Sequence, residues 1–260
     1  MPSGTSGHES QPGAAPKSVV ARALSLLDAF GADDVELTLS DLCERTGLPK
    51  TTVHRFVGEL VEWGALERSR YGLRLGFRLF SLGEQVARYQ RLRDLSTPFL
   101  EDLYEATRES AHLAVLDGSE VLYLAKVRGH GSTPTLSRIG GRLPSHCTGV
   151  GKALLSVGPQ ESLEDRLSAG LPRLTPHTVV TPGLLERDLN ASRERGYSID
   201  REETRMGIVS VAAPILDRRA EPVAAIAVAG RTHNIRVDRI ATSVQSAAAR
   251  LSAAIGGPGA

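Results

Sequence analysis

Residues 47–56 have the sequence Gly47-Leu48-Pro49-Lys50-Thr51-Thr52-Val53-His54-Arg55-Phe56. The glycine is suited to ending one helix with a positive φ, and the proline is suited to the first turn of the next. From Val53 onward, apolar residues recur at the i, i+3, i+4, i+7 and i+8 positions of an amphipathic helix. The positions between them are polar. The spacing therefore predicts a short turn that leads into a helix with one buried face and one exposed polar face.

The neighbouring residues extend this prediction to a complete small domain. Thr38 and Ser40 are each suited to capping a short helix over residues 41–46, with Leu39, Leu42 and Cys43 on its inner face. Two helices joined by a glycine-containing turn form a helix-turn-helix. A further helix is expected from about residue 17, and its apolar face is formed by Val20, Ala23, Leu24, Leu27 and Phe30. Extended segments at 65–68 and 71–75, joined through Ser69 and Arg70, predict a tight hairpin that would serve as a wing.

The charge distribution indicates what this domain contacts. The 260-residue chain has 31 Lys+Arg and 30 Asp+Glu, so its net charge of +1 is not that of a basic nucleic-acid binder. Residues 45–78 nevertheless hold seven basic and three acidic residues, a local balance of +4. Phosphate binding depends on the local face of the protein. The candidate DNA-binding residues are Lys50, Thr51, Thr52, His54 and Arg55 on the helix, and Arg68, Arg70 and Arg74 on the wing. A helical hairpin that only packs, or a winged helix used for protein contacts, is the alternative.

The rest of the chain predicts a second domain. Residues 1–16 are rich in Pro, Gly and Ser and are expected to be a disordered tail. We assign residues 17–76 to the winged helix-turn-helix, 77–94 to a linker helix and 95–255 to an α+β domain with an antiparallel sheet. A separate helix is expected after Pro98, and a strand is expected at 136–139. The linker has more apolar residues than one short helix needs, which favours dimer packing over packing within the chain.

Composition excludes several classes of protein. No apolar run approaches the roughly 20 residues that cross a bilayer, and the N-terminus lacks the apolar segment of a signal peptide. Two cysteines, Cys43 and Cys147, are too few for a disulfide scaffold. A soluble cytoplasmic protein without membrane attachment is expected.

The chain resembles the IclR family of bacterial transcriptional regulators from about residue 17 to 254. The similar motifs in the first half begin at Lys17, Gly47 and Tyr71. Those in the second half are His146-Cys147-Thr148-Gly149-Val150-Gly151-Lys152-Ala153 and the segments beginning at Gly196 and Gly207. The resemblance implies an N-terminal winged helix, a linker helix and a C-terminal GAF-like sensor domain. It also implies homodimers or dimers of dimers that bind pseudo-palindromic double-stranded DNA operators.

The resemblance further implies a cavity for a small organic effector, with carboxylic acids as one class. The effector-binding residues that it implies are Leu143, Gly149, Val150, Asp200, Ser210, Ala227 and Ala229. Some acid-binding members have Ser at the positions of Ala227 and Ala229, so alanine here favours a larger or more apolar effector. Other roles remain open: the glycines can cap a helix, Ser210 and Ala227 can pack within the sheet, and Asp200 and Glu203 can be surface charges.

The sequence supports other chemistries less well. Gly149-Val150-Gly151-Lys152 lacks the earlier glycine and the following Ser or Thr of a phosphate-binding loop. His146 and Cys147 are adjacent, which is a poor arrangement for a nucleophile and its base, and no third partner is evident. No metal-ligand spacing is present. We therefore predict no catalytic residues, no metal and no cofactor. An enzyme built on the second domain is the remaining alternative.

Overall fold

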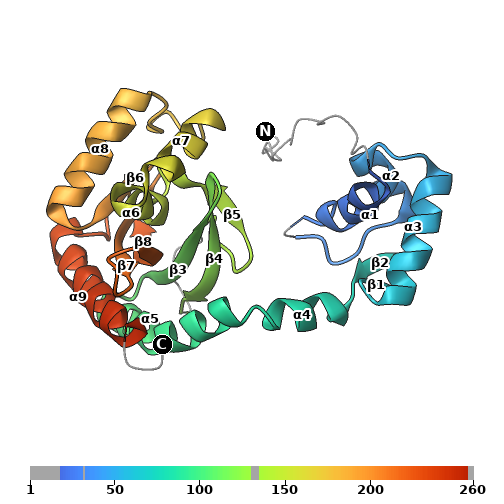
Figure 1. The fold of residues 1–260 in the computed structure, drawn as a ribbon, viewed down its shortest axis with the longest axis horizontal. Helices are drawn as coiled ribbons and strands as arrows, with labels where there is room; N and C mark the ends of the chain where they lie inside the picture. Colours follow the sequence, from blue (N-terminus) through green and yellow to red (C-terminus); the bar gives the residue numbers. More distant parts are fainter. Residues whose placement is uncertain (1–17, 32, 130–134, 257–260) are drawn as a thin grey trace. The chain divides into compact units, whose positions relative to one another are not determined.

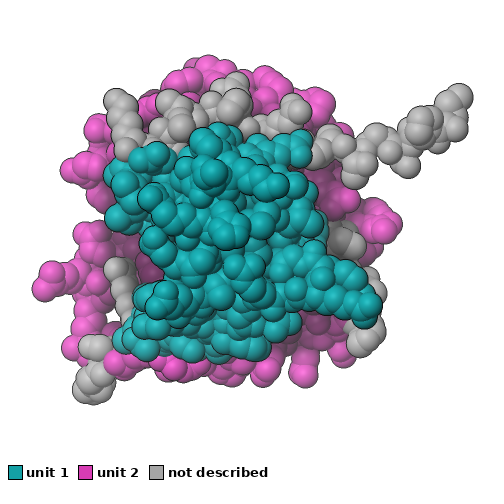
Figure 2. Space-filling model, turned by 90° about the vertical axis from the view of Figure 1, so that its right-hand side faces the viewer, with its two compact units in different colours: residues 1–87 teal, residues 88–260 magenta. Residues whose placement is uncertain are grey.

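The computed structural model describes residues 18–31, 33–129 and 135–256. The expected disordered tail at residues 1–16 lies outside these ranges. The chain divides into two compact units, Met1–Ala87 and Arg88–Ala260, coloured separately in Figure 2. Each unit has its own hydrophobic core, so each is described by itself.

The first unit is a helix-turn-helix with a two-stranded wing (Figure 1). Its elements are α1 Val19–Asp28, α2 Leu39–Thr46, α3 Lys50–Trp63, β1 Leu66–Arg68, β2 Leu73–Leu75 and α4 Phe77–Glu84. Leu26, Leu42 and Phe56 are at the centre of its core. The expected inner face of α1 is wrong at Val20 and Leu24, which are exposed. The core contacts of α1 come from its C-terminal part, where Leu26 is the buried residue.

Local signals explain the ends of α2. The Thr38 side chain accepts a hydrogen bond from the Asp41 backbone N–H, and Asp41 accepts one from the Thr38 N–H. This reciprocal capping box satisfies donors that a helix N-terminus would otherwise leave free. At the other end Gly47 has a φ of 66°, the left-handed conformation that glycine adopts most readily. Of the two candidate caps, Thr38 therefore begins the helix, and the glycine turn is confirmed.

The predicted two-residue hairpin turn is wrong. Arg68 pairs with Leu73, so the connection runs over residues 69–72. The Ser69 hydroxyl oxygen accepts hydrogen bonds from the N–H groups of Tyr71 and Gly72, at 3.1 and 3.0 Å. A Cβ at Gly72 would lie 2.5 Å from the Leu37 carbonyl oxygen, so this loop requires glycine for close approach. The side-chain hydrogen bonds of Ser69 stabilise the longer loop, which strand spacing alone did not reveal.

The expected helix at 77–94 is two helices in the structure. The chain leaves the helical conformation at Gln85 and Val86, between α4 and α5 Ala87–Thr107. The separate helix expected after Pro98 is also wrong, because α5 continues through that proline. Proline removes one backbone donor but can remain inside a helix whose other hydrogen bonds and packing are kept. Leu92, Leu100 and Leu103 on α5 are buried in the core of the second unit.

The second unit is built on a six-stranded antiparallel sheet with strand order β5-β4-β3-β8-β7-β6. The strands are β3 Ser110–Asp117, β4 Glu120–Val127, β5 Arg142–Pro144, β6 Ser198–Arg201, β7 Ile208–Leu216 and β8 Pro222–Arg231. The hairpin predicted at Asp117 and Gly118 is confirmed. Residues 136–139, which were expected to form a strand, are irregular, and the third strand of this region is β5 instead.

Helices cover both faces of this sheet (Figure 1). One face packs against α5 and α9 Val237–Ile255. The other face packs against α6 Gly149–Val157, which follows the short 3₁₀ helix η1 Ser145–Cys147. Helices α7 Gln160–Ser168 and α8 Pro182–Arg195 pack against α6 through leucines of a separate cluster. The antiparallel α+β architecture predicted from the sequence is confirmed.

Candidate functional site

Helix α3 has one buried and one exposed face. Val53, Phe56 and Val57 are buried in the core of the first unit. On the opposite face Lys50, Thr51, His54 and Arg55 are exposed, and Thr52 is half-buried. Within the described parts of the chain, Lys50 and Arg55 form no ion pair. The first turns of α3 therefore present cations and hydroxyl groups that are available to an external partner.

The wing arginines differ in their contacts. Arg68 and Arg70 are exposed and have no ion pair among the described residues, whereas Arg74 is paired with Glu67 on the adjacent strand. Arg74 Nη2 lies 2.8 Å from Glu67 Oε2, and Arg74 Nε lies 3.0 Å from the same oxygen. The Phe77 N–H and the Arg74 guanidinium both lower the pKa of Glu67 below its ordinary value. The positive charge of Arg74 is therefore already balanced by Glu67 within the wing.

Two other basic residues of the +4 stretch also have structural partners. Arg45 forms an ion pair with Asp34 and donates to the Ala29 carbonyl oxygen at 2.9 Å. Arg78 donates to the Trp63 carbonyl oxygen at 2.9 Å, and its guanidinium lies 4.3 Å from the centre of the Trp63 ring. The sequence count treated these charges as free. They differ in this from Lys50, Arg55, Arg68 and Arg70, which have no ion pair in the described parts of the chain, although Arg55 lies over the Phe56 ring and Arg70 over the Tyr71 ring.

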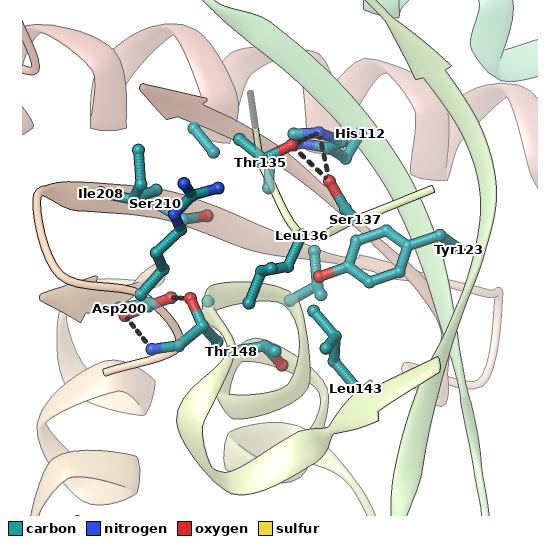
Figure 3. Close-up of a pocket in the computed structure, with 16 residues that line it drawn as sticks. His112, Tyr123, Thr135, Leu136, Ser137, Leu143, Thr148, Asp200, Ile208 and Ser210 are labelled. Atoms are coloured by element: carbon teal, nitrogen blue, oxygen red, sulfur yellow. Dashed lines mark hydrogen bonds between the residues drawn. The ribbon is translucent and has the colours of Figure 1, made fainter. Parts of the chain in front are cut away.

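The second unit contains a cavity beside the N-terminus of α6 (Figure 3). All seven residues expected around an effector line it. They come from β5 (Leu143), the start of α6 (Gly149, Val150), β6 (Asp200), β7 (Ser210) and β8 (Ala227, Ala229). The strand register places Ser110, Ala229, Ser210 and Asp200 in one row across the sheet. Three members of this row, Ala229, Ser210 and Asp200, line the cavity.

The N-terminus of α6 contributes backbone donors to the cavity. Thr148 caps the helix by accepting a hydrogen bond from the Gly151 N–H at 3.0 Å. The N–H groups of Gly149 and Val150 have no hydrogen-bond partner among the described residues. Such free donors at the positive end of a helix favour an anion. A Cβ at Gly149 would lie 2.8 Å from Ser210 Oγ, and a Cβ at Gly151 would lie 2.1 Å from the Ser145 carbonyl oxygen. Both glycines are thus required for close packing here.

Asp200 is buried at one end of the cavity. Its carboxylate accepts hydrogen bonds from the Glu203 N–H at 2.7 Å and the Thr204 hydroxyl at 2.6 Å. Burial raises the pKa of Asp200 to about 6, although the Thr204 hydrogen bond and nearby Lys152 act in the opposite direction. Lys152, 1% exposed, is paired with Glu203 and with Asp188 at 2.7 Å. Asp200 and Glu203 are therefore buried groups and not surface charges, and Glu203 connects the segment after β6 to α6 through Lys152.

The cavity also has a polar end that the sequence analysis missed. It is formed by His112 on β3, Tyr123 on β4, and Thr135 and Ser137 in the irregular segment before β5. His112 Nε2 lies 2.8 Å from Ser137 Oγ, and Lys126 Nζ lies 2.7 Å from Thr135 Oγ1. Burial, followed by the charge of Lys126, lowers the pKa of His112 to about 3. The available signal was the presence of polar residues within two otherwise apolar strands.

The neighbouring His146 and Cys147 are not arranged as a nucleophile and base. His146 Nε2 lies 3.1 Å from the Pro172 carbonyl oxygen, and Cys147 Sγ lies 3.6 Å from the Pro144 carbonyl oxygen. Burial raises the pKa of the Cys147 thiol well above its ordinary value, which disfavours the reactive thiolate. Over the described residues, no group of three or more His, Cys, Asp or Glu side chains has the arrangement of a metal site. Nor does any helix in those ranges have the length and apolar character needed to cross a membrane.

Comparisons with known proteins identify relatives over nearly the whole chain. Residues 19–70 match the IclR helix-turn-helix domain, and residues 84–253 match the bacterial transcriptional regulator IclR C-terminal domain. The Escherichia coli regulator XynR is 32% identical over 92% of this chain and 97% of its own. The Escherichia coli transcriptional repressor IclR is 33% identical over 91% and 89%. The crystal structure of an IclR homologue from Microbacterium hydrocarbonoxydans, complexed with 4-hydroxybenzoate, is 33% identical. It superposes with a TM-score of 0.84 over 92% of this chain and 99% of that one.

Proposed function

Because this chain belongs to the IclR family of bacterial transcriptional regulators, we propose that α3 is the helix that reads its DNA operator. The observation that carries this assignment is the exposed face of α3, where Lys50, Thr51, His54 and Arg55 are available to a partner. A helix of this kind enters the major groove with its N-terminal residues at the base edges. Thr52 belongs to the same reading face, and Thr51 and Thr52 can also contact phosphate. Arg68 and Arg70 on the wing add contacts to the backbone, and Arg74 contributes less because of Glu67.

The test is the affinity of the full-length protein for DNA fragments from beside its own gene, measured by fluorescence anisotropy. Arg55→Ala should weaken specific binding by about 1–3 kcal/mol and relax base preference at one position. The matched control is Arg239→Ala on α9, which removes an exposed arginine from the other unit and should leave affinity unchanged. If Arg55→Ala binds DNA as tightly as the unaltered protein at both low and high salt, α3 is a protein-contact surface instead.

The same proposal assigns the cavity of the second unit to a small effector with a carboxylate. The free N–H groups of Gly149 and Val150 and the hydroxyl of Ser210 suit the anionic end of such a molecule. Ala227 and Ala229 offer methyl groups in place of hydroxyls, which suits an apolar ring better than a very small polar acid. The relative crystallised with 4-hydroxybenzoate supports this choice. The proposed effector class is therefore aromatic carboxylic acids.

Isothermal titration calorimetry with benzoate, 4-hydroxybenzoate and pyruvate tests this class on the full-length protein. The aromatic acids should bind more tightly than pyruvate, and they should change the affinity for the operator. An effector shifts the arrangement of DNA-binding domains only if it binds one arrangement better than another. Binding of pyruvate alone would contradict the proposed class. Conversion of an added acid into a product would instead favour the enzyme alternative.

We also propose that the chain works as a homodimer or a dimer of dimers in the cytoplasm, where a bacterial operator is found. The assignment of residues 17–76 to DNA binding, 77–94 to the linker and 95–255 to the sensor is part of this proposal. Its support is the apolar surface of the linker region, where Phe77 is 77% and Phe80 is 68% exposed. Exposed apolar residues in such a group favour a protein partner. Light scattering on the purified protein tests it, and a monomeric mass would contradict it.

A further inference from the structure

The strand β4 has an irregularity that determines which side chains reach the cavity. Leu113 pairs with Ala125, whereas the next residue, Ala114, pairs with Tyr123. Leu124 is therefore an extra residue in β4, as in a β-bulge. Without it, Tyr123 and Lys126 would lie on opposite faces of the sheet, because side chains alternate along a strand. With it, both residues share the face of His112 and Ala114, which is the cavity face.

The bulge creates what we call the distal polar end of the cavity, consisting of His112, Tyr123, Thr135 and Ser137. Lys126 is behind it and donates to Thr135 Oγ1 and to the Ser137 carbonyl oxygen, both at 2.7 Å. Thr135 Oγ1 lies 2.8 Å from Ser137 Oγ, which lies 2.8 Å from His112 Nε2. These side chains therefore hold one another in place before any ligand is present. In Figure 3 this group lies across the cavity from Asp200 and Thr148.

Tyr123 differs from the other members of this group. Its side chain extends from β4 toward the middle of the cavity with the hydroxyl leading (Figure 3). The residue is 6% exposed, and its hydroxyl has no hydrogen-bond partner among the described residues. Burial raises the pKa of Tyr123 above its ordinary value, so the hydroxyl remains protonated and can donate. Its oxygen is accessible from the cavity and is not fully enclosed, so a ligand oxygen there can accept its hydrogen bond.

The ring of His112 positions this hydroxyl. The two rings meet edge to face, with centroids 5.9 Å apart and an angle of 72° between their planes. This is a preferred arrangement for aromatic pairs. Because His112 is itself held by Ser137, the Tyr123 ring is supported on a fixed neighbour.

The lining between the two ends of the cavity indicates the shape of a partner that reaches both. This middle part is formed by Ala227 and Ala229 on β8 and by Leu136, Leu143 and Ile208, which are all apolar. A molecule that contacts both the N-terminus of α6 and the Tyr123 hydroxyl must therefore carry polar groups at opposite sides of an apolar centre, as a ring with two opposite substituents does.

We infer that Tyr123 is an effector-binding residue that donates a hydrogen bond to a hydroxyl on the aromatic ring, at the side opposite the carboxylate. The recognised group is uncharged, because Tyr123 and His112 are neutral and Lys126 already donates to Thr135 and Ser137. This inference rests on the proposed effector site, with the carboxylate at the N-terminus of α6. It adds a means of distinguishing hydroxylated aromatic acids from unsubstituted ones.

The experiment compares 4-hydroxybenzoate with benzoate by isothermal titration of the full-length protein. The unaltered protein should prefer 4-hydroxybenzoate by about five- to tenfold, as one added hydrogen bond predicts. Tyr123→Phe should bind benzoate as before and lose that preference. Tyr71→Phe, which removes the same atom from an exposed tyrosine of the first unit, should retain it. Ser137→Ala, which removes the hydroxyl that holds His112, should reduce the preference as well and provides a second variant if Tyr123→Phe folds poorly.

Each contrary outcome has a distinct meaning. If both variants retain the preference of the unaltered protein, the inference is overturned while the proposed effector class stands. An equal loss of affinity for both acids in Tyr123→Phe would place its hydroxyl on the carboxylate and also overturn the inference. If the unaltered protein binds no aromatic acid, the proposed effector class itself fails, and this inference fails with it.

Discussion

The exposed face of α3 and the cavity of the second unit are both polar, but they are built in opposite ways. On α3, the cations Lys50 and Arg55 are exposed and without ion pairs in the described parts of the chain. In the second unit, Lys152 and Glu203 are almost completely buried and paired with each other. One surface keeps its charges available for a partner, and the other uses its charges to hold its own shape.

This difference follows from the two kinds of ligand proposed here. A DNA backbone is a large array of charges in water, and counterion release provides affinity without burial of the protein cations. A small effector offers few contacts, so its site must be organised beforehand and its polar groups must already be held in place. The comparison predicts that the same kind of change, removal of one cation, lowers the stability of the second unit when the cation is buried Lys152, but lowers DNA affinity when the cation is on the exposed face of the first unit.

The largest effect is expected at Lys152. Lys152→Met keeps most of the side-chain volume but leaves Glu203 buried without its cation, beside Asp188. Removing one partner of a buried pair typically costs about 3–5 kcal/mol. Urea unfolding, monitored by far-ultraviolet circular dichroism, should show that the free energy of unfolding of the second unit falls by that amount. Trp63, the only tryptophan of the chain, lies on α3, so its fluorescence should show little change in the first unit.

The control for this prediction is Arg142→Met, which breaks an exposed pair with Asp117. Exposed pairs contribute about 0–1 kcal/mol, so this variant should unfold almost as the unaltered protein does. Similar losses for Lys152→Met and Arg142→Met would contradict the proposed contrast between buried and exposed charges.

The next effect concerns Asp200 and pH. Its pKa is raised to about 6, mainly by burial, whereas the ordinary value is 3.8. The folded protein therefore favours the protonated form of Asp200. The contribution of this group to the free energy of unfolding is complete below about pH 4 and is lost as the pH rises through 6. The loss amounts to about 2–3 kcal/mol. Asp200→Asn, which stays neutral, should gain stability relative to the unaltered protein between pH 4 and 7. Unfolding at both pH values measures this gain, and a pH-independent difference would exclude it.

The helix-turn-helix was predictable because its signals are local. Thr38, Gly47 and the apolar spacing after Val53 act within a few residues of one another, and each has a direct physical effect on the backbone. Six of the eight proposed DNA-binding residues are exposed without ion pairs in the described ranges, Thr52 is half-buried, and Arg74 is paired. The pairing of Arg74 with Glu67 depends on the hairpin register, which was not predictable once the loop length was misjudged.

The cavity was predictable only where the family resemblance supplied positions. Seven lining residues follow from it, but His112 and Tyr123 do not, because their role depends on the extra residue Leu124 and on the irregular segment at 135–137. Lys152 and Glu203 lie 51 positions apart, and neither residue carries a local sign of burial. Local physics therefore accounts for backbone turns and helix faces, whereas side-chain partners arise from register and packing over long distances.

The smallest expected effect separates two arginines of the wing. Arg70→Ala should reduce the slope of log affinity against log salt concentration by about 1, because it removes one phosphate contact. Arg74→Ala should change that slope less, because the Arg74 guanidinium is neutralised by Glu67 at 2.8 Å. Anisotropy titrations of an operator fragment over a series of potassium chloride concentrations measure both slopes. Equal reductions would mean that Arg74 leaves Glu67 on binding DNA, so that the wing, unlike the buried pairs of the second unit, exchanges an internal partner for an external one.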